Sequence, residues 1–453
     1  MKKHYHFIGI GGIGMSGIAQ LFLKNGVKVS GSDLKESHST NELKAKGAEI
    51  FIGHDAQNIN GASLVIYSSA IKDNNPEIIL AKKQGIPLIK RAEALAQLMS
   101  EKSVVAVSGS HGKTTTTSLI SYLLIEAGLN PTVAVGGILR NIGTNAFFGN
   151  GKFFVAEADE SDGSFLYYRP KYSIVTNIDR EHLDYYTDFE SELKAFRKFI
   201  DQTDKTGCVF YCKDDDNLNN LLKGYKHKKI SFGLKENAEV YAKSIIFEGL
   251  SSEFDCFHKE KFVGKFSLSL GGRHNISNAL SVIALGLELG LDLKFIKKAL
   301  KDYKGSGRRA EIKYKDNDYL VIDDYAHHPT EIKATLSALK NLQKNRVITV
   351  FQPHRYSRTK LLLEEFKKAF DMADYLILTD IYAASEEPIE GVTGEILAEL
   401  IKKNLNGKTV CFLPKNKIVE HILSIIKPGD LVATLGAGDI TKLSDELAQK
   451  IKS

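Results

Sequence analysis

The sequence is poor in cysteine, in long apolar runs and in blocks of like charge. Its four cysteines form no paired CxxC motif, which favours structural thiols over a zinc or redox site. No window approaches the roughly 18 consecutive apolar residues that span a bilayer, so no membrane partner is expected. The net charge of +6 comes from scattered lysines rather than from a basic arm, so nucleic-acid binding is not expected either.

The amino terminus lacks the features of a secretory signal. Residues 1–6 lead directly into a glycine-rich turn, with no apolar stretch and no small-residue cleavage site. We therefore expect no export and a cytoplasmic location. With 453 residues, the chain exceeds the roughly 250–300 residues that one hydrophobic core serves, which predicts about three domains.

Each third of the chain opens with an apolar strand that leads into a loop rich in glycine or functional side chains. These strands are expected at 5–8, 104–108 and 319–322. Strands and helices alternate after them, which is typical of parallel sheets covered by helices on both faces. Further strands are expected at 27–30, 153–156, 173–176, 347–351, 375–378 and 431–435.

We predict an α/β fold of three domains. Residues 1–102 form a Rossmann-like domain, residues 103–307 a central P-loop-type ATPase domain, and residues 308–453 a second Rossmann-like α/β domain. The last boundary follows from Gly305 and Gly307, which lie in a flexible stretch where a hinge is expected.

The first glycine-rich loop fits a diphosphate site. Its glycines let the backbone approach phosphates at a helix amino terminus, and Asp33, about 20 residues on, can hold a ribose hydroxyl. The pattern does not distinguish a dinucleotide from a UDP-sugar, and a tight turn in any βα unit also favours glycine. The candidate substrate-binding residues here are Gly9, Gly11, Gly12, Gly14 and Asp33.

The second glycine-rich loop is a shortened form of the GxxxxGK[ST] motif. Backbone amides would cradle phosphates, Lys113 would neutralise the terminal phosphates, and the Thr114 hydroxyl could bind Mg²⁺. If a triphosphate binds here, the first loop is expected to bind a second, different nucleotide. Since dehydrogenase chemistry needs no triphosphate, this weakens the alternative of a nicotinamide oxidoreductase. The candidate ATP-binding residues are Gly109, Ser110, His111, Gly112, Lys113, Thr114 and Thr115.

Carboxylates crowd the end of the strand at 153–156, in the run from Glu157 to Asp162. Such crowding favours a divalent cation, since like charges otherwise repel. His182 follows the strand at 173–176 and adds a further ligand type. We predict one Mg²⁺ at Thr114 and another at Glu157 and His182. The alternatives are an acidic surface loop and a structural histidine.

Nine motifs occur in order over essentially the whole chain: GIGGIGMSG, SGSHGKTTT, EADESDGSF, TNIDREHLDYY, GRHNISNA, GSGRRAE, DDYAHHPTE, FQPHRYSRT and LGAGD. In this combination the chain resembles the Mur ligase family. The resemblance implies that the first domain binds a UDP-sugar, the middle domain binds MgATP, and the last domain carries the amino-acid site. Domain closure would then assemble these sites and exclude water.

The resemblance also implies an activity. The chain would use ATP and Mg²⁺ to join the lactyl carboxylate of UDP-N-acetylmuramate to L-alanine through an acyl phosphate, a step of peptidoglycan precursor synthesis on which cell-wall biogenesis, cell shape and division depend. GIGGIGMSG and PHRYSRT favour L-alanine, but a relative that attaches another amino acid or a peptide stays an alternative. The oligomeric state stays open.

Further site residues are implied by the same resemblance. Lys113, Glu157, His182, His327, Arg355 and Arg358 would be catalytic, with His327 a candidate to receive the amine proton. The register of a carbamylated lysine found in several relatives is ambiguous between Lys194 and Lys198, so neither is assigned. The remaining implied residues are Asn275 and Asn278 near adenine, Arg309 at the nucleotide, and Ser161, Tyr325 and His354 at the substrates.

Overall fold

The computed structural model describes residues 3–68, 70–182, 185–342, 345–405 and 407–452. Within these ranges the strands form three sheets of five, ten and six strands. Cα proximity divides the chain into two compact units, one of residues 1–242, 256–264 and 277–304, the other of residues 243–255, 265–276 and 305–453. Within the described ranges no helix is both long and apolar enough to cross a membrane.

The first sheet is fully parallel, with strand order β3-β2-β1-β4-β5. The order reverses between β1 and β4, and open α/β sheets bind ligands at such a switch point, outside the carboxyl ends of the strands. Its strands are β1 (His4–Ile8), β2 (Lys28–Asp33), β3 (Glu49–Ile52), β4 (Leu64–Tyr67) and β5 (Leu88–Lys90). Its helices are α1 (Ile13–Lys24), α2 (His38–Ala45), α3 (Pro76–Gln84) and α4 (Arg91–Met99), with a 3-10 turn η1 at Ala56–Ile59.

The second sheet has the order β15-β14-β13-β12-β11-β10-β6-β9-β7-β8. Its central strands are parallel, whereas β7 and β8 pair antiparallel. Its strands are β6 (Ser103–Ser108), β7 (Thr132–Leu139), β8 (Thr144–Phe147), β9 (Phe153–Glu157), β10 (Tyr172–Val175), β11 (Cys208–Cys212), β12 (Lys229–Gly233), β13 (Val240–Glu248), β14 (Ser251–His258) and β15 (Lys261–Leu268). Its helices are α5 (Lys113–Glu126), α6 (Phe189–Asp201), α7 (Asp216–Leu221), α8 (Arg273–Glu288) and α9 (Leu293–Lys301), with η2 at Ser164–Tyr167.

The first two sheets share one compact unit because helix α1 packs on β7 and β8. A Cβ atom on Gly17 of α1 would lie 3.2 Å from Nδ2 of Asn145 and 3.3 Å from Cβ of Ala146. The glycine therefore lets the helix approach the hairpin closely.

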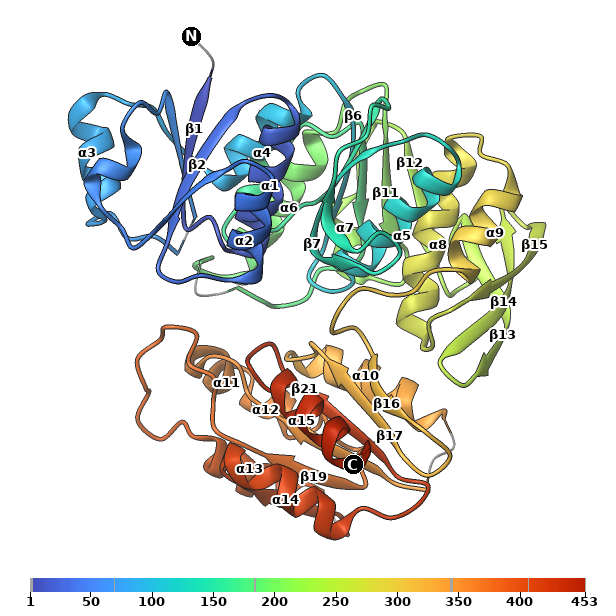
Figure 1. Cartoon of the computed structure of the whole chain (residues 1–453). Coiled ribbons are helices and arrows are strands. Elements are labelled where there is room, and N and C mark those ends of the chain that lie inside the picture. Colours follow the sequence, from blue (N-terminus) through green and yellow to red (C-terminus); the bar gives the residue numbers. More distant parts are fainter. Residues whose placement is uncertain (1–2, 69, 183–184, 343–344, 406, 453) are drawn as a thin grey trace. The chain divides into compact units, whose positions relative to one another are not determined.

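The third sheet has the order β16-β17-β21-β18-β19-β20 and is parallel except for β16 at its edge. In Figure 1 its helices pack on both faces of the sheet. Its strands are β16 (Glu311–Lys315), β17 (Leu320–Asp324), β18 (Val347–Phe351), β19 (Tyr375–Leu378), β20 (Thr409–Phe412) and β21 (Leu431–Leu435). Its helices are α10 (Pro329–Lys340), α11 (Tyr356–Leu361), α12 (Leu363–Phe366), α13 (Gly394–Lys402), α14 (Lys415–Ile425) and α15 (Thr441–Lys452).

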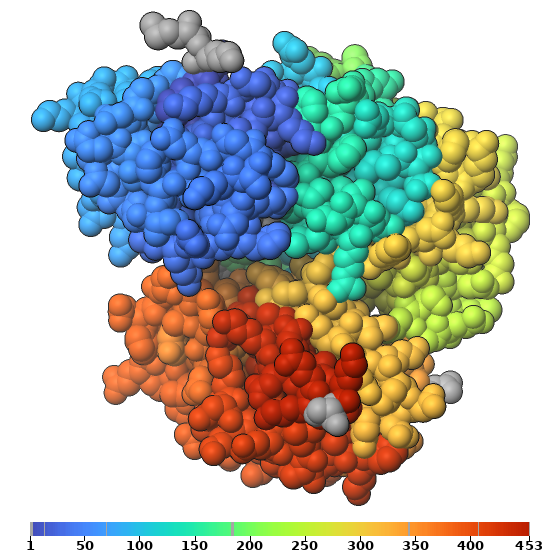
Figure 2. All heavy atoms as spheres, viewed as in Figure 1, coloured from blue at the N-terminus to red at the C-terminus, as the bar shows by residue number. Residues whose placement is uncertain are grey.

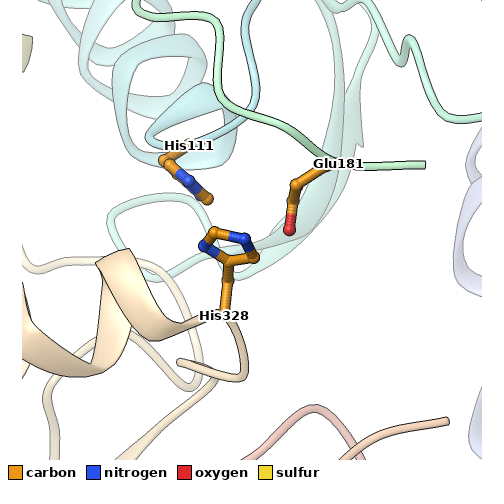
Figure 3. Close-up of side chains that lie close together, drawn as sticks. All are labelled: His111, Glu181 and His328. Carbon is orange, nitrogen blue, oxygen red and sulfur yellow. The ribbon is translucent and has the colours of Figure 1, made fainter. Parts of the chain in front are cut away.

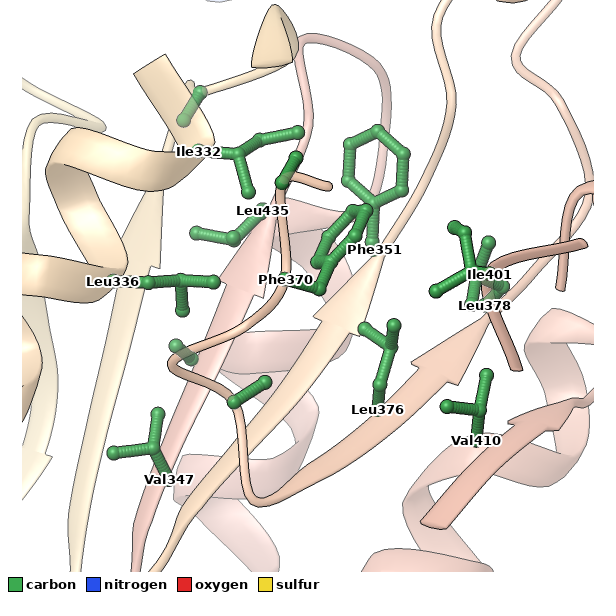
Figure 4. Close-up of a cluster of buried hydrophobic side chains, with 14 of the residues drawn as sticks. Ile332, Leu336, Val347, Phe351, Phe370, Leu376, Leu378, Ile401, Val410 and Leu435 are labelled. Atoms are coloured by element: carbon green, nitrogen blue, oxygen red, sulfur yellow. The ribbon is translucent and has the colours of Figure 1, made fainter. Parts of the chain in front are cut away.

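The core of the third sheet follows the period of two that a strand imposes on its side chains. In β18, Val347 and Phe351 join a cluster with residues of α10 and α13, whereas Ile348 and Val350 join the opposite cluster, with residues of α14 and α15. Figure 4 shows the first cluster. Figure 2 shows the outer atoms of this sheet and its helices on one face, coloured from orange to red.

The α/β prediction is confirmed, and so are the expected strands. Two features differ from expectation. The sheets are not wholly parallel, because β8 and β16 add antiparallel edges. Strand β17 continues through Asp323 and Asp324, because their backbone pairs with Thr434 and Leu435 of β21. Their carboxylates are bound within the fold, Asp323 to Arg308 at 3.1 Å and Asp324 to the backbone N–H of Ala310 at 2.6 Å. The boundaries at residues 102 and 307 stay predictions.

Candidate active site

The loop between β6 and α5 has a backbone that favours glycine at two positions. Gly109 has φ +128° and Gly112 has φ +83°, in the left-handed region that glycine adopts without penalty. A Cβ atom on Gly109 would lie 2.2 Å from Oγ1 of Thr176, and one on Gly112 would lie 2.6 Å from Oδ1 of Asn278. The structure thus brings Asn278 of α8 against the predicted phosphate-binding loop.

Helix α5 begins directly after Gly112, which has no side chain to cap the first turn. The first amides of the helix therefore keep donor capacity for an external acceptor, and the helix dipole adds positive potential there. Backbone amides, a glycine turn and the adjacent Lys113 together form an arrangement that binds phosphate groups.

Lys113 is the first residue of α5, and its side chain folds back onto the preceding loop. Its Nζ donates to the carbonyl oxygens of Gly109 (2.7 Å) and Ser110 (3.1 Å) and lies 2.7 Å from Oε1 of Glu160. Burial lowers the pKa of Lys113, but the carboxylates of Glu160 and Asp159 outweigh it and raise the pKa well above its usual range. The side chain therefore stays cationic.

Glu157 lies at the end of β9 and faces the start of α5. Its Oε1 accepts a hydrogen bond from Thr114 Oγ1 at 3.1 Å, and its Oε2 accepts from the N–H of Gly136 at 2.9 Å. Burial raises the pKa of Glu157, although Lys113 opposes the shift. Glu157 is half-buried, and a carboxylate whose pKa is raised by loss of water contact is a good ligand for an added cation.

A second acidic group surrounds His182. Glu160, Glu181 and His182 each offer a ligand atom, and the three atoms lie within 4.8 Å of one another. Nε2 of His182 is 3.3 Å from Oε1 of Glu160 and 3.5 Å from Oε2 of Glu181. Burial lowers the pKa of His182, but hydrogen bonding to Glu160 and the charge of Glu181 raise it overall.

The predicted metal ligands thus fall into two groups. Thr114 and Glu157 contact each other, whereas His182 contacts Glu160 and Glu181, which were not among the predicted ligands. Both glutamates lie in the motifs EADESDGSF and TNIDREHLDYY, so the sequence signal for them was their place beside Glu157 and His182. Oε2 of Glu160 is buried without a hydrogen-bond partner among the described residues, which fits a cation ligand. The hydroxyl and carboxylate oxygens of the two groups are the hard ligands that suit Mg²⁺, and His182 would add an imidazole nitrogen at the second group.

The remaining part of the loop is fixed to the end of β10. The N–H of His111 donates to Oδ1 of Asn177 at 2.8 Å, and Nε2 of His111 lies 3.0 Å from Oδ2 of Asp179. Figure 3 shows the side chains of His111, before α5, and Glu181, after β10; it also labels His328, the N-cap residue of α10. The contacts of His111 with Asn177 and Asp179 fix the loop to the end of β10.

Three other predicted residues have contacts of their own. Oγ of Ser110 accepts from the N–H of Asp179 at 2.8 Å, Thr115 is buried in α5, and the N–H of Ser161 donates to Oδ1 of Asp159 at 3.0 Å. Their ligand contacts stay predictions.

The first glycine loop follows β1 at the switch point of its sheet. Gly9 has φ +79°, and Gly12 is the N-cap residue of α1. Oδ2 of Asp33 accepts from the N–H of Gly11 and Oδ1 from the N–H of Leu34, both at 2.8 Å. Asp33 thus ties the loop to β2, and its contact with a ribose hydroxyl stays a prediction.

In the carboxy-terminal unit, Tyr325 lies among cationic side chains. The guanidinium groups of Arg308 and Arg309 lie 5.1 and 5.2 Å from its ring centroid, within cation–π range. Nδ1 of His327 is 3.0 Å from the carbonyl oxygen of Tyr325 and 3.3 Å from Oε2 of Glu331. Tyr325 and His327 are brought together as predicted, Arg308 was missed beside Arg309, and the nucleotide contact of Arg309 stays a prediction.

His354 forms the second part of this cluster. Its ring stacks on Tyr382 at 5.6 Å and 11°, and meets the ring of His327 edge-on at 5.6 Å. Nη1 of Arg358 donates to the Nδ1 of His354 at 3.1 Å, and Arg355, the N-cap residue of α11, has φ +68°. Burial, with the neighbouring positive groups, lowers the pKa of His354 to about 3. Tyr382 was missed because it lies outside the quoted motifs.

The low pKa of His354 predicts a stability change in acid. Between the ordinary histidine value of about 6.5 and the folded value of about 3, the unfolded chain binds a proton that the folded chain does not. The stability that the unprotonated ring of His354 gives the folded state is complete above about pH 6.5. It is lost as the pH falls below that value. We expect the pH dependence of the free energy of unfolding, from urea titrations at pH 4.5–7.5, to be shallower in His354→Asn; an unchanged slope would contradict the shift.

The two asparagines of α8 differ in their contacts. Asn278 lies against Gly112, as described above. Nδ2 of Asn275 donates to the carbonyl oxygen of Gly271 at 2.8 Å, which fixes the start of the helix. Their proximity to adenine stays a prediction.

Comparison with family models covers almost the whole chain. Residues 4–103 match the model described as Mur ligase family, catalytic domain; residues 107–286 match the Mur ligase middle domain, and residues 308–438 match the Mur ligase, glutamate ligase domain. Three consecutive models accord with the three sheets.

Two curated relatives and two solved structures are similar to this chain over nearly their full lengths. The UDP-N-acetylmuramate--L-alanine ligase of Geotalea daltonii is 47% identical over 450 residues, which cover 99% of this chain and 98% of the relative. The ligase of the same name from Sulfurihydrogenibium sp. is 48% identical and covers 99% and 97%. Among solved structures, the UDP-N-acetylmuramate-alanine ligase of Thermotoga maritima has a TM-score of 0.84 at 31% identity and 99% coverage of both chains. A murein peptide ligase of Psychrobacter arcticus has a TM-score of 0.71 at 25% identity, with 99% and 98% coverage.

Proposed function

Since this chain belongs to the Mur ligase family, we propose that it uses ATP to join L-alanine to the lactyl carboxylate of UDP-N-acetylmuramate. The observation that carries the proposal is the name shared by relatives that are 44–48% identical over at least 98% of this chain. The product is a precursor of peptidoglycan, so cell-wall growth, cell shape and division would depend on it. ATP and the UDP-sugar place the proposed reaction in the cytoplasm.

The chemistry of the substrates explains why ATP is needed. A carboxylate is a poor electrophile, because its charge repels an amine and its leaving group would be an oxide. Transfer of the γ-phosphoryl group to the carboxylate gives an acyl phosphate, whose leaving group is phosphate. The amine of L-alanine then attacks the carbonyl carbon, and the tetrahedral intermediate expels phosphate.

The loop around Lys113 supports this step. The first amides of α5 and the ammonium of Lys113 would hold the β- and γ-phosphates and stabilise the charge that develops during transfer. For this the Lys113 ammonium must exchange its contacts with the Gly109 and Ser110 carbonyls for phosphate oxygens. Thr114, Glu157 and the group of Glu160, Glu181 and His182 would hold Mg²⁺, which supplies positive charge to phosphate and carboxylate oxygens.

The cluster of the carboxy-terminal unit supports binding of the amino acid. His327 and Arg358 flank the neutral ring of His354, and a guanidinium grips a carboxylate bidentately. In the proposal Arg355 and Arg358 bind the substrate carboxylate and phosphate groups, and His327 accepts the proton that the amine loses. Tyr325 and His354 form the walls of the amino-acid site.

Arg358→Lys is expected to weaken the use of L-alanine more than turnover. A lysine keeps the charge but loses the two parallel donors, so we expect KM for L-alanine to rise about 10-fold with a smaller change in kcat. Steady-state kinetics with varied L-alanine measure both constants. Lys360→Arg, at an exposed position of the same helix, is the matched control. An unchanged KM would remove Arg358 from the amino-acid site.

The proposal as a whole is tested by product mass. The enzyme is incubated with UDP-N-acetylmuramate, ATP, Mg²⁺ and one amino acid at a time from a panel, with a tripeptide as a further acceptor. We expect a product only with L-alanine or close analogues, one alanine residue heavier than the sugar nucleotide. A product with the peptide alone would instead identify a murein peptide ligase, the activity named for the relative from Psychrobacter arcticus.

A further inference from the structure

Tyr382 covers one face of His354 in the proposed amino-acid site, although it lies outside the motifs of that site. The rings of Tyr382 and His354 are stacked, with their centroids 5.6 Å and their planes 11° apart. Main-chain hydrogen bonds hold the two residues in register. The N–H of Tyr382 donates to the carbonyl oxygen of Pro353 at 2.8 Å, and its carbonyl oxygen accepts from the N–H of Arg355 at 2.9 Å. The main chain on both sides of His354 is therefore bound to Tyr382.

The loop after β21 also packs on Tyr382. A Cβ atom on Gly438 would lie 2.6 Å from Cγ and 2.8 Å from Cβ of Tyr382, so the loop backbone directly contacts the base of the tyrosine ring. Arg308 anchors this loop through hydrogen bonds to the carbonyl oxygens of Gly436 and Gly438. The same guanidinium binds the buried carboxylate of Asp323 at 3.1 Å. The base of the Tyr382 side chain is thus fixed, although the residue is 39% exposed.

His354 in turn orients Arg358. Nη1 of Arg358 lies 3.1 Å from Nδ1 of His354, and a guanidinium has only donors, so Nδ1 is the unprotonated acceptor of a neutral ring. This hydrogen bond uses one of the five N–H donors of Arg358 and leaves the others for a carboxylate. The direction in which Arg358 presents those donors therefore depends on the plane of the His354 ring, against which the ring of Tyr382 is stacked.

We infer that Tyr382 is a positioning residue of the proposed ligase reaction: by holding the ring of His354, it directs the Arg358 guanidinium at the carboxylate of the incoming amino acid. The inference rests on the proposed function, which supplies L-alanine as the ligand of this cluster. Tyr382 acts through His354 and Arg358 rather than by contact with the amino acid. Loss of a stacked aromatic pair corresponds to about a 3- to 10-fold loss of affinity, which sets the size of the expected effect.

Substitutions of Tyr382 separate its ring face from the rest of the side chain. Tyr382→Leu keeps a γ-carbon against Gly438 but has no flat face, whereas Tyr382→Phe keeps the face and loses only the hydroxyl. In steady-state kinetics, we expect KM for L-alanine to rise about 3- to 10-fold in Tyr382→Leu, with a smaller change in kcat and an unchanged KM for ATP. Tyr382→Ala, a second variant without a flat face, should do the same, and Tyr382→Phe should recover the wild-type KM.

Leu423→Ala, at a 38% exposed position of α14, is the control for truncation of a similarly exposed side chain and should behave like the wild type. Thermal unfolding checks that each variant is folded at the assay temperature. An unchanged KM for L-alanine in the variants without a flat face, or an equal rise in Tyr382→Phe, would overturn the inference and leave the proposed function intact.

A double-mutant cycle tests the path through Arg358. Tyr382→Leu should raise KM for L-alanine by less than about 2-fold in the Arg358→Lys background, because the guanidinium that Tyr382 helps to direct is already gone. A rise as large as in the wild-type background would show that Tyr382 acts independently of Arg358 and would overturn the inference. A wild type that forms no product with L-alanine would instead overturn the proposed function, and the inference with it.

Discussion

Lys113→Ala is expected to lower kcat by at least about 10²–10³-fold, the loss typical of one preorganised donor to a developing charge. Lys113 is the cation of the loop, and its pKa is raised by Glu160 and Asp159 against the effect of burial, so it is fully charged when ATP binds. In the proposed reaction this charge stabilises the phosphoryl group during transfer. The measurement is phosphate release at saturating UDP-N-acetylmuramate, ATP and L-alanine.

The control for Lys113→Ala is Lys82→Ala, which removes an ammonium from an exposed pair with Asp73. It should keep nearly full turnover, since exposed pairs contribute about 0–1 kcal/mol and lie outside the loop. Thermal unfolding confirms that both variants are folded at the assay temperature. Near-normal turnover of Lys113→Ala would remove the loop from the account of ATP use.

Glu160→Gln is expected to destabilise the fold by about 3 kcal/mol. Removing one partner of a buried ion pair costs about 3–5 kcal/mol, because it leaves the other charge buried without its counter-ion. The Glu160 side chain is 0% exposed and lies 2.7 Å from Nζ of Lys113. We expect the lower end of the range, because Asp159 and Glu181 also attract Lys113 and remain in the variant.

Urea unfolding in metal-free buffer measures this effect as a change in the free energy of unfolding. Glu190→Gln makes the same chemical change at a side chain that is 73% exposed, and should shift the free energy of unfolding by less than about 1 kcal/mol. Equal stability of the two variants would show that the pair of Lys113 and Glu160 does not hold the loop.

The strands that carry the site could be predicted because buried parallel strands are continuous apolar runs. The run at 104–108 became β6, and the glycines that follow it have the positive φ angles that the motif indicates. The three consecutive family models confirm three domains. Composition and periodicity do not show which strands lie at an edge, so the antiparallel β8 and β16 were not foreseen.

Side-chain pairing across the fold could not be predicted from spacing. Lys113 and Glu160 are 47 positions apart, and the acidic run shows that carboxylates gather without showing which of them faces the lysine. From the sequence alone, Asp33 could contact a ribose hydroxyl or a group of the protein, because a carboxylate accepts hydrogen bonds from either. In the structure it accepts a hydrogen bond from the N–H of Gly11. Arg91 belongs to no motif, and its place beside Gly14 follows only from packing.

In the proposed reaction, ATP activates the sugar carboxylate as an acyl phosphate at the Lys113 loop. UDP-N-acetylmuramate labelled with ¹⁸O in both oxygens of the lactyl carboxylate tests it directly, with the released phosphate analysed by mass spectrometry after reaction with ATP and L-alanine. We expect one ¹⁸O atom in each phosphate and one retained in the amide. Unlabelled phosphate, or release of pyrophosphate and AMP in place of phosphate and ADP, would contradict it.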